Sequence, residues 1–309
     1  MSLSVYSDKM VSVIIPCWNS EIYISQTITS VLSQTYPYFE LIIIDDGSTD
    51  KSADIIKSFS DQRLRYYYQE NKGLPAARNK GIINSSGSLI AFLDSDDIWL
   101  PNKLEKQVQV IEHYDLIYCD YITIDENNNT IIQKNRPYFS TENISDPFLL
   151  GMNILGSGSS VLMKKKIIDS VGLFNEKLSF AEDQEYWTRI AWEKFSFHYL
   201  NEILVKIRSH KNSMQAITKI EKRYESLKLM IETFLGFNQL TKYNKGTIYN
   251  EYFFIIYSYS DNFSELFHCF IHIIRNNIKR IEWRHLLYLL KFIPRKLFRA
   301  IQLSSHLSA

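Results

Sequence analysis

The sequence predicts an α/β fold, with a mostly parallel sheet covered by helices on both faces and a helical region at the C-terminal end. Over the first hundred residues, short apolar runs alternate with segments whose apolar residues recur three and four positions apart, as in strands alternating with helices. After about residue 215, strand-like runs become rare and segments that favour helix predominate. We therefore expect one domain over residues 1–215 and a helical region over residues 216–309.

The strands and helices of the first domain follow one another closely. Four apolar runs are predicted to be strands, at residues 11–16, 41–45, 64–68 and 89–94. The segments between them are predicted to be helices, at residues 21–34, 50–59 and 74–83. A hairpin around the turn-forming ENNN is expected from residues 116–125 and 130–133, followed by a strand at 159–165 and a helix at 181–195. In such a sheet, ligands bind beyond the carboxyl ends of the strands.

Composition and charge argue against several classes of protein. Lys and Arg total 35 against 34 Asp and Glu, so the charge gives no reason to expect a nucleic-acid partner. The three cysteines are widely spaced, which predicts neither a disulfide framework nor a zinc site and favours a reducing compartment. The polar N-terminus lacks the apolar run of a signal peptide, and no stretch approaches the roughly 20 apolar residues of a spanning helix. We expect a cytoplasmic protein, or one bound peripherally to the cytoplasmic face of a membrane.

Two of the predicted strands end in clustered acids. Asp45 and Asp46 end the second strand, and Asp94, Asp96 and Asp97 end the fourth. Because the carboxyl ends of parallel strands meet at one edge of the sheet, these carboxylates could converge on one cleft, where their repulsion would be costly. A divalent cation shared with a phosphate group would offset it, since Mg2+ binds through one or two carboxylates and substrate phosphates. The alternative is that each acid only caps the helix that follows it.

Other polar residues follow strands at the same predicted edge. Pro16 and Asn19 come at the end of the first strand, where a nucleotide base or ribose would be approached. Arg78 follows the third strand, and its planar guanidinium suits a phosphate group or a base edge, although a surface ion pair would explain it equally well. The segment GSTD does not form a phosphate loop, because the Gly-rich spacing that ends in Lys and Ser or Thr is missing.

Six segments together resemble a known family. They occur in the order VSVIIPCWN, SVLSQTY, LIIIDDGSTD, NKGLPAARNKG, FLDSDDIWLPNKL and AEDQEYWTRI. This series resembles the inverting family 2 glycosyltransferases over roughly residues 10 to 215, which implies the GT-A fold, a Rossmann-like arrangement. The resemblance also implies transfer of a hexosyl or N-acetylhexosaminyl group from a nucleotide-diphosphate sugar, most simply a UDP-sugar. The acceptor would be a hydroxyl of a saccharide or lipid-linked saccharide, as in bacterial surface polysaccharide synthesis.

The resemblance assigns the donor site residue by residue. Asp45 and Asp46 would hold the base and ribose, with Pro16 and Asn19 lining the same pocket. Arg78 would add positive charge beside the departing diphosphate. Cys17 and Trp18 stand where Thr or Ser and Tyr are commoner in the family, and neither change removes a group that the chemistry needs.

The aspartate-any-aspartate element of the family falls at Asp94, Ser95 and Asp96. By the family pattern Asp96 would hold Mg2+ or Mn2+, and Asp94 would contact the ribose or the metal and its water. His210 is a further candidate ligand, because Arg208 and His210 resemble an Arg-any-His element that closes over the diphosphate in some relatives. A solvated histidine in a loop is the simpler explanation of His210.

The late Glu-Asp pair of the family falls at Glu182 and Asp183, of which Asp183 would be the catalytic base. An acceptor hydroxyl must lose its proton as it attacks the anomeric carbon, so a carboxylate is needed on the acceptor side. Because the N-terminus of the helix favours the ionised form of Asp183, a raised basicity of this carboxylate would have to come from burial against Trp187 and similar neighbours. Gly158 and Ser159, in GSGSS (156–160), are expected on the donor-sugar or acceptor side, as are Glu182 and Trp187. An ordinary acidic first turn and a flexible connection are the alternatives.

The C-terminal segment 267–301 is both apolar and basic. Lys291, Arg295 and Arg299 repeat every four residues, beside a face of apolar side chains. Such a segment can lie in a membrane interface with its aromatic residues near the headgroups. Packing on the first domain, or a contact between subunits of a homo-oligomer, would use the same apolar face.

Two other functions are compatible with parts of this pattern. A haloacid-dehalogenase-like phosphatase also carries an Asp-any-Asp element after an apolar strand and would use Asp94 and Asp96. There the first Asp lies in an N-terminal motif, whereas here the element follows the fourth predicted strand. A non-catalytic nucleotide-sugar binding module with the same fold is the second alternative, disfavoured by the presence of Asp94, Asp96 and Asp183.

Overall fold

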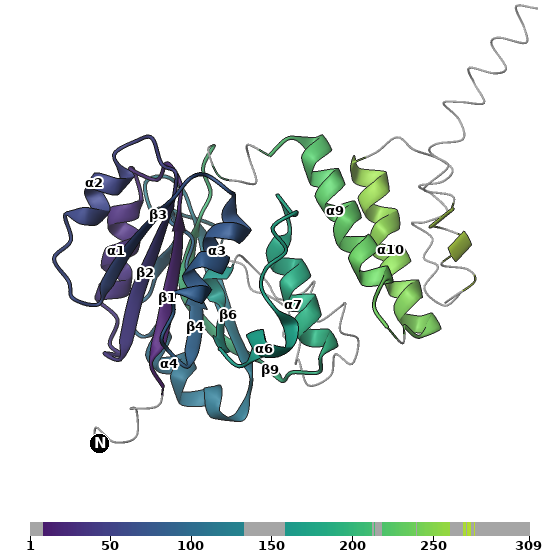
Figure 1. The fold of residues 1–309 in the computed structure, drawn as a ribbon, viewed down its shortest axis with the longest axis horizontal. Helices are drawn as coiled ribbons and strands as arrows, with labels where there is room; N and C mark the ends of the chain where they lie inside the picture. Colours follow the sequence, from purple (N-terminus) through teal and green to yellow (C-terminus); the bar gives the residue numbers. More distant parts are fainter. Residues whose placement is uncertain are drawn as a thin grey trace, which may run out of the picture. The chain divides into compact units, whose positions relative to one another are not determined.

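The computed structural model describes residues 9–132, 158–211, 213, 218–238 and 240–259, together with residues 268, 269, 271, 272 and 275. The chain separates into two compact units, Met1–Ile217 and Thr218–Ala309. The first unit contains the sheet and its helices, and the second contains helices (Figure 1). Each unit is described by itself below.

The N-terminal half of the sheet is parallel. Its strands are β1 (Val11–Cys17), β2 (Phe39–Asp46), β3 (Leu64–Gln69) and β4 (Leu89–Phe92), in the spatial order β3-β2-β1-β4. All three pairings among them are parallel, and all residues of β1, β2 and β4 are buried. Such uninterrupted apolar runs are typical of strands covered on both faces. The four predicted strands are confirmed.

The sheet becomes mixed beyond β4. There β8 (Leu162–Lys164) runs antiparallel to both β4 and β6 (Leu116–Ile124), β9 (Phe197–Arg208) is parallel to β6, and β5 (Ile98–Trp99) and β7 (Thr130–Ile132) add antiparallel pairings. The sequence did not predict β9 as a strand. Its pairing with β6 shifts register between Cys119 and Asp120, where Asn201 and Glu202 have no partner, and this irregularity interrupts the alternation by which strands are recognised.

Helices cover both faces of the sheet, as predicted. On one face lie α1 (Ile24–Leu32), α2 (Ser52–Lys57) and α4 (Lys103–Val110), whose apolar residues join one buried cluster with Val13 and Ile15 of β1. On the other lie α3 (Leu74–Ile83), α6 (Ile167–Val171) and α7 (Glu182–Trp192), which join a second cluster with Ile14. Figure 1 shows α1 and α3 on opposite sides of β1. Alternate residues of one strand therefore serve two separate cores.

The second unit contains α9 (Ile220–Leu235) and α10 (Lys242–Tyr259), which pack against each other. Buried apolar side chains include Met230 and Phe234 of α9 and Phe253 of α10. Among the residues that the structure describes, no helix is both long and apolar enough to cross a membrane. The basic segment at 267–301 lies almost entirely outside the described residues, and with it the predicted membrane or subunit contact.

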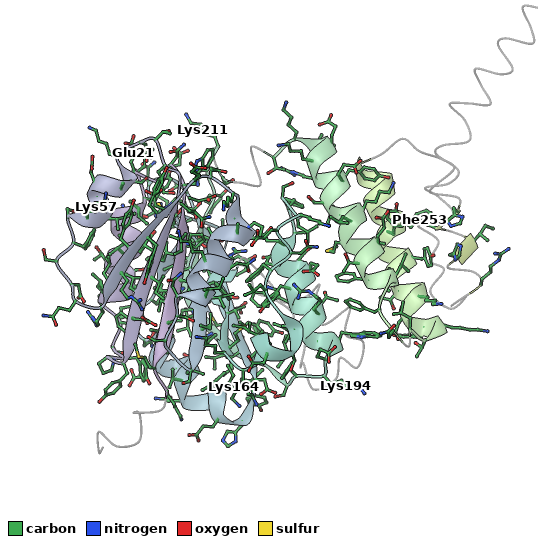
Figure 2. All side chains as sticks on the ribbon, in the orientation of Figure 1. Glu21, Lys57, Lys164, Lys194, Lys211 and Phe253 are labelled. Carbon is green, nitrogen blue, oxygen red and sulfur yellow. The ribbon has the colours of Figure 1, made fainter. Side chains whose placement is uncertain are left out.

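The carboxyl ends of the parallel strands define one edge of the first unit. Glu21 and Lys211, which follow β1 and β9, lie at this edge, and Lys164 of β8 lies at the opposite one (Figure 2). Pro16 is buried in β1 two residues past Ile14, where the pairing with β4 ends, so its missing N–H costs no hydrogen bond on that side. The loops at this edge carry the candidate site.

Candidate active site

Asp45, at the end of β2, is almost fully buried and is held by nearby donors. Its Oδ1 accepts a hydrogen bond from the backbone N–H of Ser48 (2.8 Å), and its Oδ2 accepts one from the Tyr66 hydroxyl (2.7 Å). Burial and the Asp45 carboxylate raise the pKa of Tyr66, so this hydroxyl remains a donor to Asp45 at neutral pH. Asp45 thus fixes the start of the loop after β2.

Asp46 fixes the entry to α3. Its Oδ1 accepts hydrogen bonds from Gln69 Nε2 (2.7 Å) and from the backbone N–H of Lys72 (2.9 Å), and its Oδ2 accepts one from the backbone N–H of Gly73 (2.8 Å). A carboxylate offers about four acceptor positions, so about one remains for a ligand. The residue is 3% exposed, so its main role is to hold the backbone at the entry to α3.

Asn19 links the loops after β1 and β2. Its backbone adopts a left-handed φ of 49°, its N–H donates to Ser48 Oγ (3.0 Å), and its Oδ1 accepts from the N–H of Thr49 (2.8 Å). Asn tolerates this conformation better than most residues. The neighbouring Trp18 is 48% exposed, so the loop presents a large aromatic side chain to solvent.

The aspartate turn, Asp94–Asp97, follows β4 and is bonded to Arg78. The Asp94 Oδ1 accepts from Arg78 Nη2 (2.9 Å), and Arg78 Nη1 donates to Glu182 Oε1 (2.7 Å). The Arg78 side chain is 2% exposed, against 23% for Asp94. Although burial disfavours its charge, the carboxylates of Asp94, Glu182 and Asp183 raise the pKa of Arg78. The guanidinium therefore lies inside the protein between two carboxylates, which differs from the predicted position beside a diphosphate.

Asp96 and His210 come together across the site. His210 Nε2 lies 2.8 Å from Asp96 Oδ2, with side-chain exposures of 8% and 25%. The His210 ring also lies 4.8 Å from the ring of Tyr23, between centroids, in a tilted arrangement. His210 is therefore packed against the aspartate turn, unlike a histidine in a solvated loop.

The Asp96 and His210 pair is compatible with a divalent cation. Two adjacent ligands of an octahedral ion, each about 2.1 Å from it, lie about 3 Å apart, close to the separation of these two atoms. Asp94 is turned toward Arg78, and the described part of the chain contains no cluster of three or more His, Cys, Asp or Glu side chains that could hold a metal. Phosphate oxygens and water would have to complete the coordination, as is usual for Mg2+.

Asp97 and Ser159 hold the aspartate turn from within. Asp97 Oδ1 accepts from the N–H of Arg208 (2.9 Å), and its Oδ2 accepts from the Ser159 hydroxyl (2.6 Å). Ser159 Oγ also accepts from the N–H of Asp94 (3.1 Å). Burial, followed by the charges of Asp96 and Asp94, raises the pKa of Asp97. Asp97 is thus no helix cap, and Ser159, which is fully buried, supports the turn instead of facing a sugar.

Ser95 is held by residues that the sequence did not single out. Its Oγ lies 2.6 Å from Ser20 Oγ. The hydroxyl of Thr27, on α1, lies 3.0 Å from the carbonyl oxygen of Ser95 and 2.9 Å from that of Asp97. A small hydroxyl on the buried face of a helix gives no signal in a single sequence, so Thr27 could be found only in the structure.

Arg208 is the last residue of β9, and each nitrogen of its guanidinium donates a hydrogen bond to an oxygen of the protein. Nε donates to the Asp96 carbonyl (2.9 Å), Nη1 to the Asp125 carbonyl (3.0 Å), and Nη2 to Gln26 Oε1 (3.1 Å) and Asn128 Oδ1 (2.9 Å). It therefore ties the aspartate turn to α1 and to the turn before β7.

Glu182 and Asp183 begin α7, directly after Ala181, which has a left-handed φ of 59°. Glu182 is buried against Arg78, whereas Asp183 is partly exposed and accepts a hydrogen bond from the N–H of Gln184 (2.8 Å). Burial and the adjacent Glu182 carboxylate raise the pKa of Asp183 to about 7, against the opposing effect of Arg78. A carboxylate with such a pKa can accept a proton near neutral pH.

Two residues expected on the sugar side lie inside the protein. Trp187 is fully buried, with its ring 6.2 Å from that of Phe92 and 6.1 Å from that of Phe174, between centroids. It therefore belongs to the aromatic core behind α7. Gly158 is buried and packs closely on β4, because an added Cβ would lie 3.3 Å from the Cβ of Phe92. Gly156 and Ser157 of the same loop lie outside the described residues.

Comparison with known proteins decides the family. The model of "Glycosyl transferase family 2" matches residues 12–171, just over half of the chain. This chain belongs to glycosyl transferase family 2. An uncharacterized glycosyltransferase of Rickettsia typhi is 32% identical over 234 residues, which cover 74% of this chain and 72% of that protein. The family membership excludes the phosphatase alternative, and the enzyme is a glycosyltransferase.

A second relative and a solved structure complete the comparison. The UDP-Glc:alpha-D-GlcNAc-diphosphoundecaprenol beta-1,3-glucosyltransferase WfgD of Escherichia coli is 44% identical over 130 residues, 41% of this chain and 51% of that enzyme. The crystal structure of S. aureus TarS 1–349 in complex with UDP-GlcNAc matches this glycosyltransferase with a TM-score of 0.64 at 20% identity, over 92% of this chain and 79% of that one. This likeness confirms the predicted GT-A fold.

Proposed function

We propose that this glycosyltransferase transfers a sugar, with inversion, from a UDP-sugar to a hydroxyl of a saccharide or lipid-linked saccharide, and that it depends on Mg2+ or Mn2+. The observation that carries the proposal is the position of Asp183. It is a partly exposed carboxylate with a raised pKa, next to the Arg78 pairs that link α7 to the aspartate turn. Inverting transfer needs a base that takes the proton of the acceptor hydroxyl, and a partly exposed carboxylate with a raised pKa can serve as that base.

In this reaction Asp183 accepts the proton of the acceptor hydroxyl as its oxygen attacks the anomeric carbon. The bond between that carbon and the diphosphate oxygen breaks with its electron pair, and the nucleoside diphosphate leaves. Attack from the side opposite the leaving group inverts the anomeric centre. Because burial and the Glu182 carboxylate raise the pKa of Asp183 to about 7, its carboxylate is more basic than that of an ordinary aspartate and can take this proton near neutral pH.

Asp96 and His210 are the residues that would hold the divalent ion, because their side chains meet and remain partly accessible. A bound Mg2+ or Mn2+ supplies Lewis-acid stabilisation of the charge that develops on the departing diphosphate. Asp97, Ser159 and Arg208 keep the aspartate turn in place through the hydrogen bonds described above. Asp94 orients the turn through its pair with Arg78.

The loops after β1 and β2 would bind the nucleotide. Asp46 retains about one acceptor position, which suits the N–H of a uracil ring, and Trp18 offers an exposed aromatic face for stacking. Asp45, Asn19 and Pro16 would shape this pocket mainly by fixing the backbone. Ser95 would contribute through the hydroxyl pair that it forms with Ser20.

The acceptor and the location rest on the relatives. The E. coli relative is named for a UDP-glucose donor and a diphosphoundecaprenol-linked acceptor, which supports a lipid-linked saccharide here. An enzyme with such an acceptor would work at the cytoplasmic face of a membrane. Residues 1–215 would form the catalytic domain, and residues 216–309 would supply a membrane or subunit contact.

The test is hydrolysis of the donor, in which water takes the place of the acceptor hydroxyl, measured as release of UDP by the purified full chain from UDP-glucose and UDP-GlcNAc, with Mn2+ and with a chelator. We expect metal-dependent release from at least one donor, lost in Asp183→Asn although calorimetry shows that the donor still binds. Asp54→Asn, an exposed acid in the first turn of α2, is the matched control and should keep full activity. Donor binding without turnover in wild type would favour the non-catalytic module instead.

A further inference from the structure

Arg78 joins two parts of the site that are far apart in the sequence. Its Nη2 contacts Asp94 in the aspartate turn, and its Nη1 contacts Glu182, the first residue of α7, at 2.9 and 2.7 Å. Glu182 directly precedes Asp183. One buried cation therefore spans the distance between the acids that follow β4 and the helix that carries the proposed base.

We propose that Arg78 is a positioning residue for transfer: by bridging Asp94 and Glu182 it fixes Asp183 relative to the aspartate turn and supplies a buried positive charge beside the residue that precedes it. This inference rests on the proposed function, in which Asp183 takes the proton of the acceptor. Arg78 itself is buried and need not touch either substrate.

The surroundings of Arg78 hold its guanidinium in one orientation. The guanidinium carbon lies 5.5 Å from the centre of the Phe174 ring, and Gly158 packs beside the guanidinium. Among the described residues, Nε of Arg78 has no hydrogen-bond partner. The ion pairs that Arg78 forms there are made by Nη2 with Asp94 and by Nη1 with Glu182. The guanidinium of Arg78 therefore interacts mainly with these two carboxylates.

Three charged groups act on Asp183 from the described elements: Arg78 from α3, Asp94 from the aspartate turn and Glu182 from α7 itself. Glu182 and Asp94 raise the pKa of Asp183, whereas Arg78 lowers it. The two partners of the Arg78 and Glu182 ion pair therefore have opposite effects on the base.

The experiment measures UDP release from UDP-GlcNAc and UDP-glucose with Mn2+ in the full chain, from about pH 5 to about pH 9. In Arg78→Met, the pH at which the rate reaches half of its plateau should rise by about 1 unit or more, because an opposite charge has been removed. In Glu182→Gln it should fall. Movement of both variants in the same direction, or of neither, overturns the inference.

Arg189 supplies the matched control. It lies on α7, as Asp183 does, and pairs with the buried Glu185 at 2.7 Å, but it is not among the groups with the largest effects on the pKa of Asp183. Arg189→Met should lower the melting temperature and leave the half-plateau pH unchanged. A shift equal to that of Arg78→Met would mean that any damage to α7 moves the profile, which overturns the inference.

Two further variants guard against loss of the fold. The double variant Arg78→Met, Glu182→Gln removes both charges of this ion pair, so it should fold even if Arg78→Met does not. Its half-plateau pH should lie between those of the two single variants. Arg78→Lys should keep a nearly normal pH profile and lose rate, because the charge remains and the two-pronged bridge does not. A double variant that folds and matches Glu182→Gln at every pH overturns the inference.

Asp183→Asn separates this inference from the proposed function. If that variant still transfers, the assignment of the base is wrong, whatever Arg78 does. If Asp183→Asn is inactive while folded Arg78→Met and Glu182→Gln keep the profile of the wild type, the base is right and the role of Arg78 is overturned.

Discussion

The ends of β2 and β4 both carry acids after a buried apolar strand, but their carboxylates have different partners. Those of Asp45 and Asp46 are held by donors in the loop after β2, on the adjacent strand β3 and in the loop that follows β3. Those of Asp94 and Asp96 are partly exposed and contact Arg78 and His210, cationic or potentially cationic groups from distant elements. The first pair shapes a loop, and the second pair remains open to a ligand.

An acid at the end of a strand is therefore not in itself a ligand site. An acid whose acceptor positions are filled by N–H groups has little capacity left for a substrate, whereas a partly exposed acid paired with a histidine, such as Asp96, can exchange that partner for a metal ion. The comparison predicts that changes at β2 affect binding and stability, and that changes at β4 affect turnover.

The largest effect is expected at Asp96. Asp96→Ala removes a ligand of the proposed metal, and loss of several kcal/mol of charge stabilisation should lower the rate of UDP release by roughly 10³-fold. The melting temperature should change little, because the carboxylate is partly exposed and its backbone contacts remain. Steady-state rates and a thermal melt check both points. A drop of less than about tenfold would mean that the two strand ends do not differ as described.

A smaller effect is expected at His210. His210→Gln should raise the Mn2+ concentration for half-maximal activity by about 10- to 100-fold, with partial recovery of the rate at high Mn2+. His198→Gln is the control, because His198 lies on the same strand β9 and stacks on Tyr114 with 4.3 Å between ring centroids. Equal Mn2+ requirements in both variants would remove His210 from the metal site.

At the end of β2, Asp46→Asn should act on donor affinity and stability. The amide replaces one acceptor oxygen by a donor that faces N–H groups, which costs about 1–3 kcal/mol of unfolding free energy. KM for the UDP-sugar should rise by about tenfold while kcat stays within a factor of about three, as expected when an interaction common to ground state and transition state is lost. Urea unfolding and initial rates measure these quantities. A fall in kcat alone would place Asp46 with the β4 acids.

The smallest effect concerns the stability of the fold at different pH values. The pKa of Asp183 is raised to about 7, so the folded state binds this proton more tightly than the unfolded chain, in which Asp titrates near 4. Its contribution is fully present below about pH 4 and is lost as the pH rises to about 7. Asp183→Asn should therefore melt about 3 °C higher than the wild type at pH 8, and the difference should shrink toward pH 5. A difference that does not depend on pH would contradict the raised pKa.

Much of the fold could be predicted because its signals are local. The buried strands β1, β2 and β4 are continuous apolar runs, and α3 has the predicted bounds. The strand β9 could not be predicted, because Asn201 and Glu202 fall at an irregularity in the middle of it. A pattern with a period of two residues cannot report a strand whose register shifts.

In the site, the types of residue could be predicted, but not the direction in which every side chain points. The aspartate turn and Asp183 were recognised by motif, and the structure brings His210 to Asp96 across 114 positions of sequence. Arg78 reads as a phosphate-binding cation until Glu182, 104 positions later, is found to occupy its Nη1. Likewise, Trp187 and Ser159 stand beside residues of the site in the sequence but are fully buried. Which way a side chain points depends on contacts distant in the chain, which one sequence does not contain.

The most direct test of the difference between the two strand ends is Mn2+ binding, followed by electron paramagnetic resonance with UDP present and absent. We predict that Asp96→Ala weakens Mn2+ binding by at least about tenfold in both conditions. Asp46→Asn should bind Mn2+ like the wild type without UDP and differ only when UDP is present. Equal affinity of the wild type and Asp96→Ala for Mn2+, or an equal loss in Asp46→Asn without nucleotide, would contradict the account.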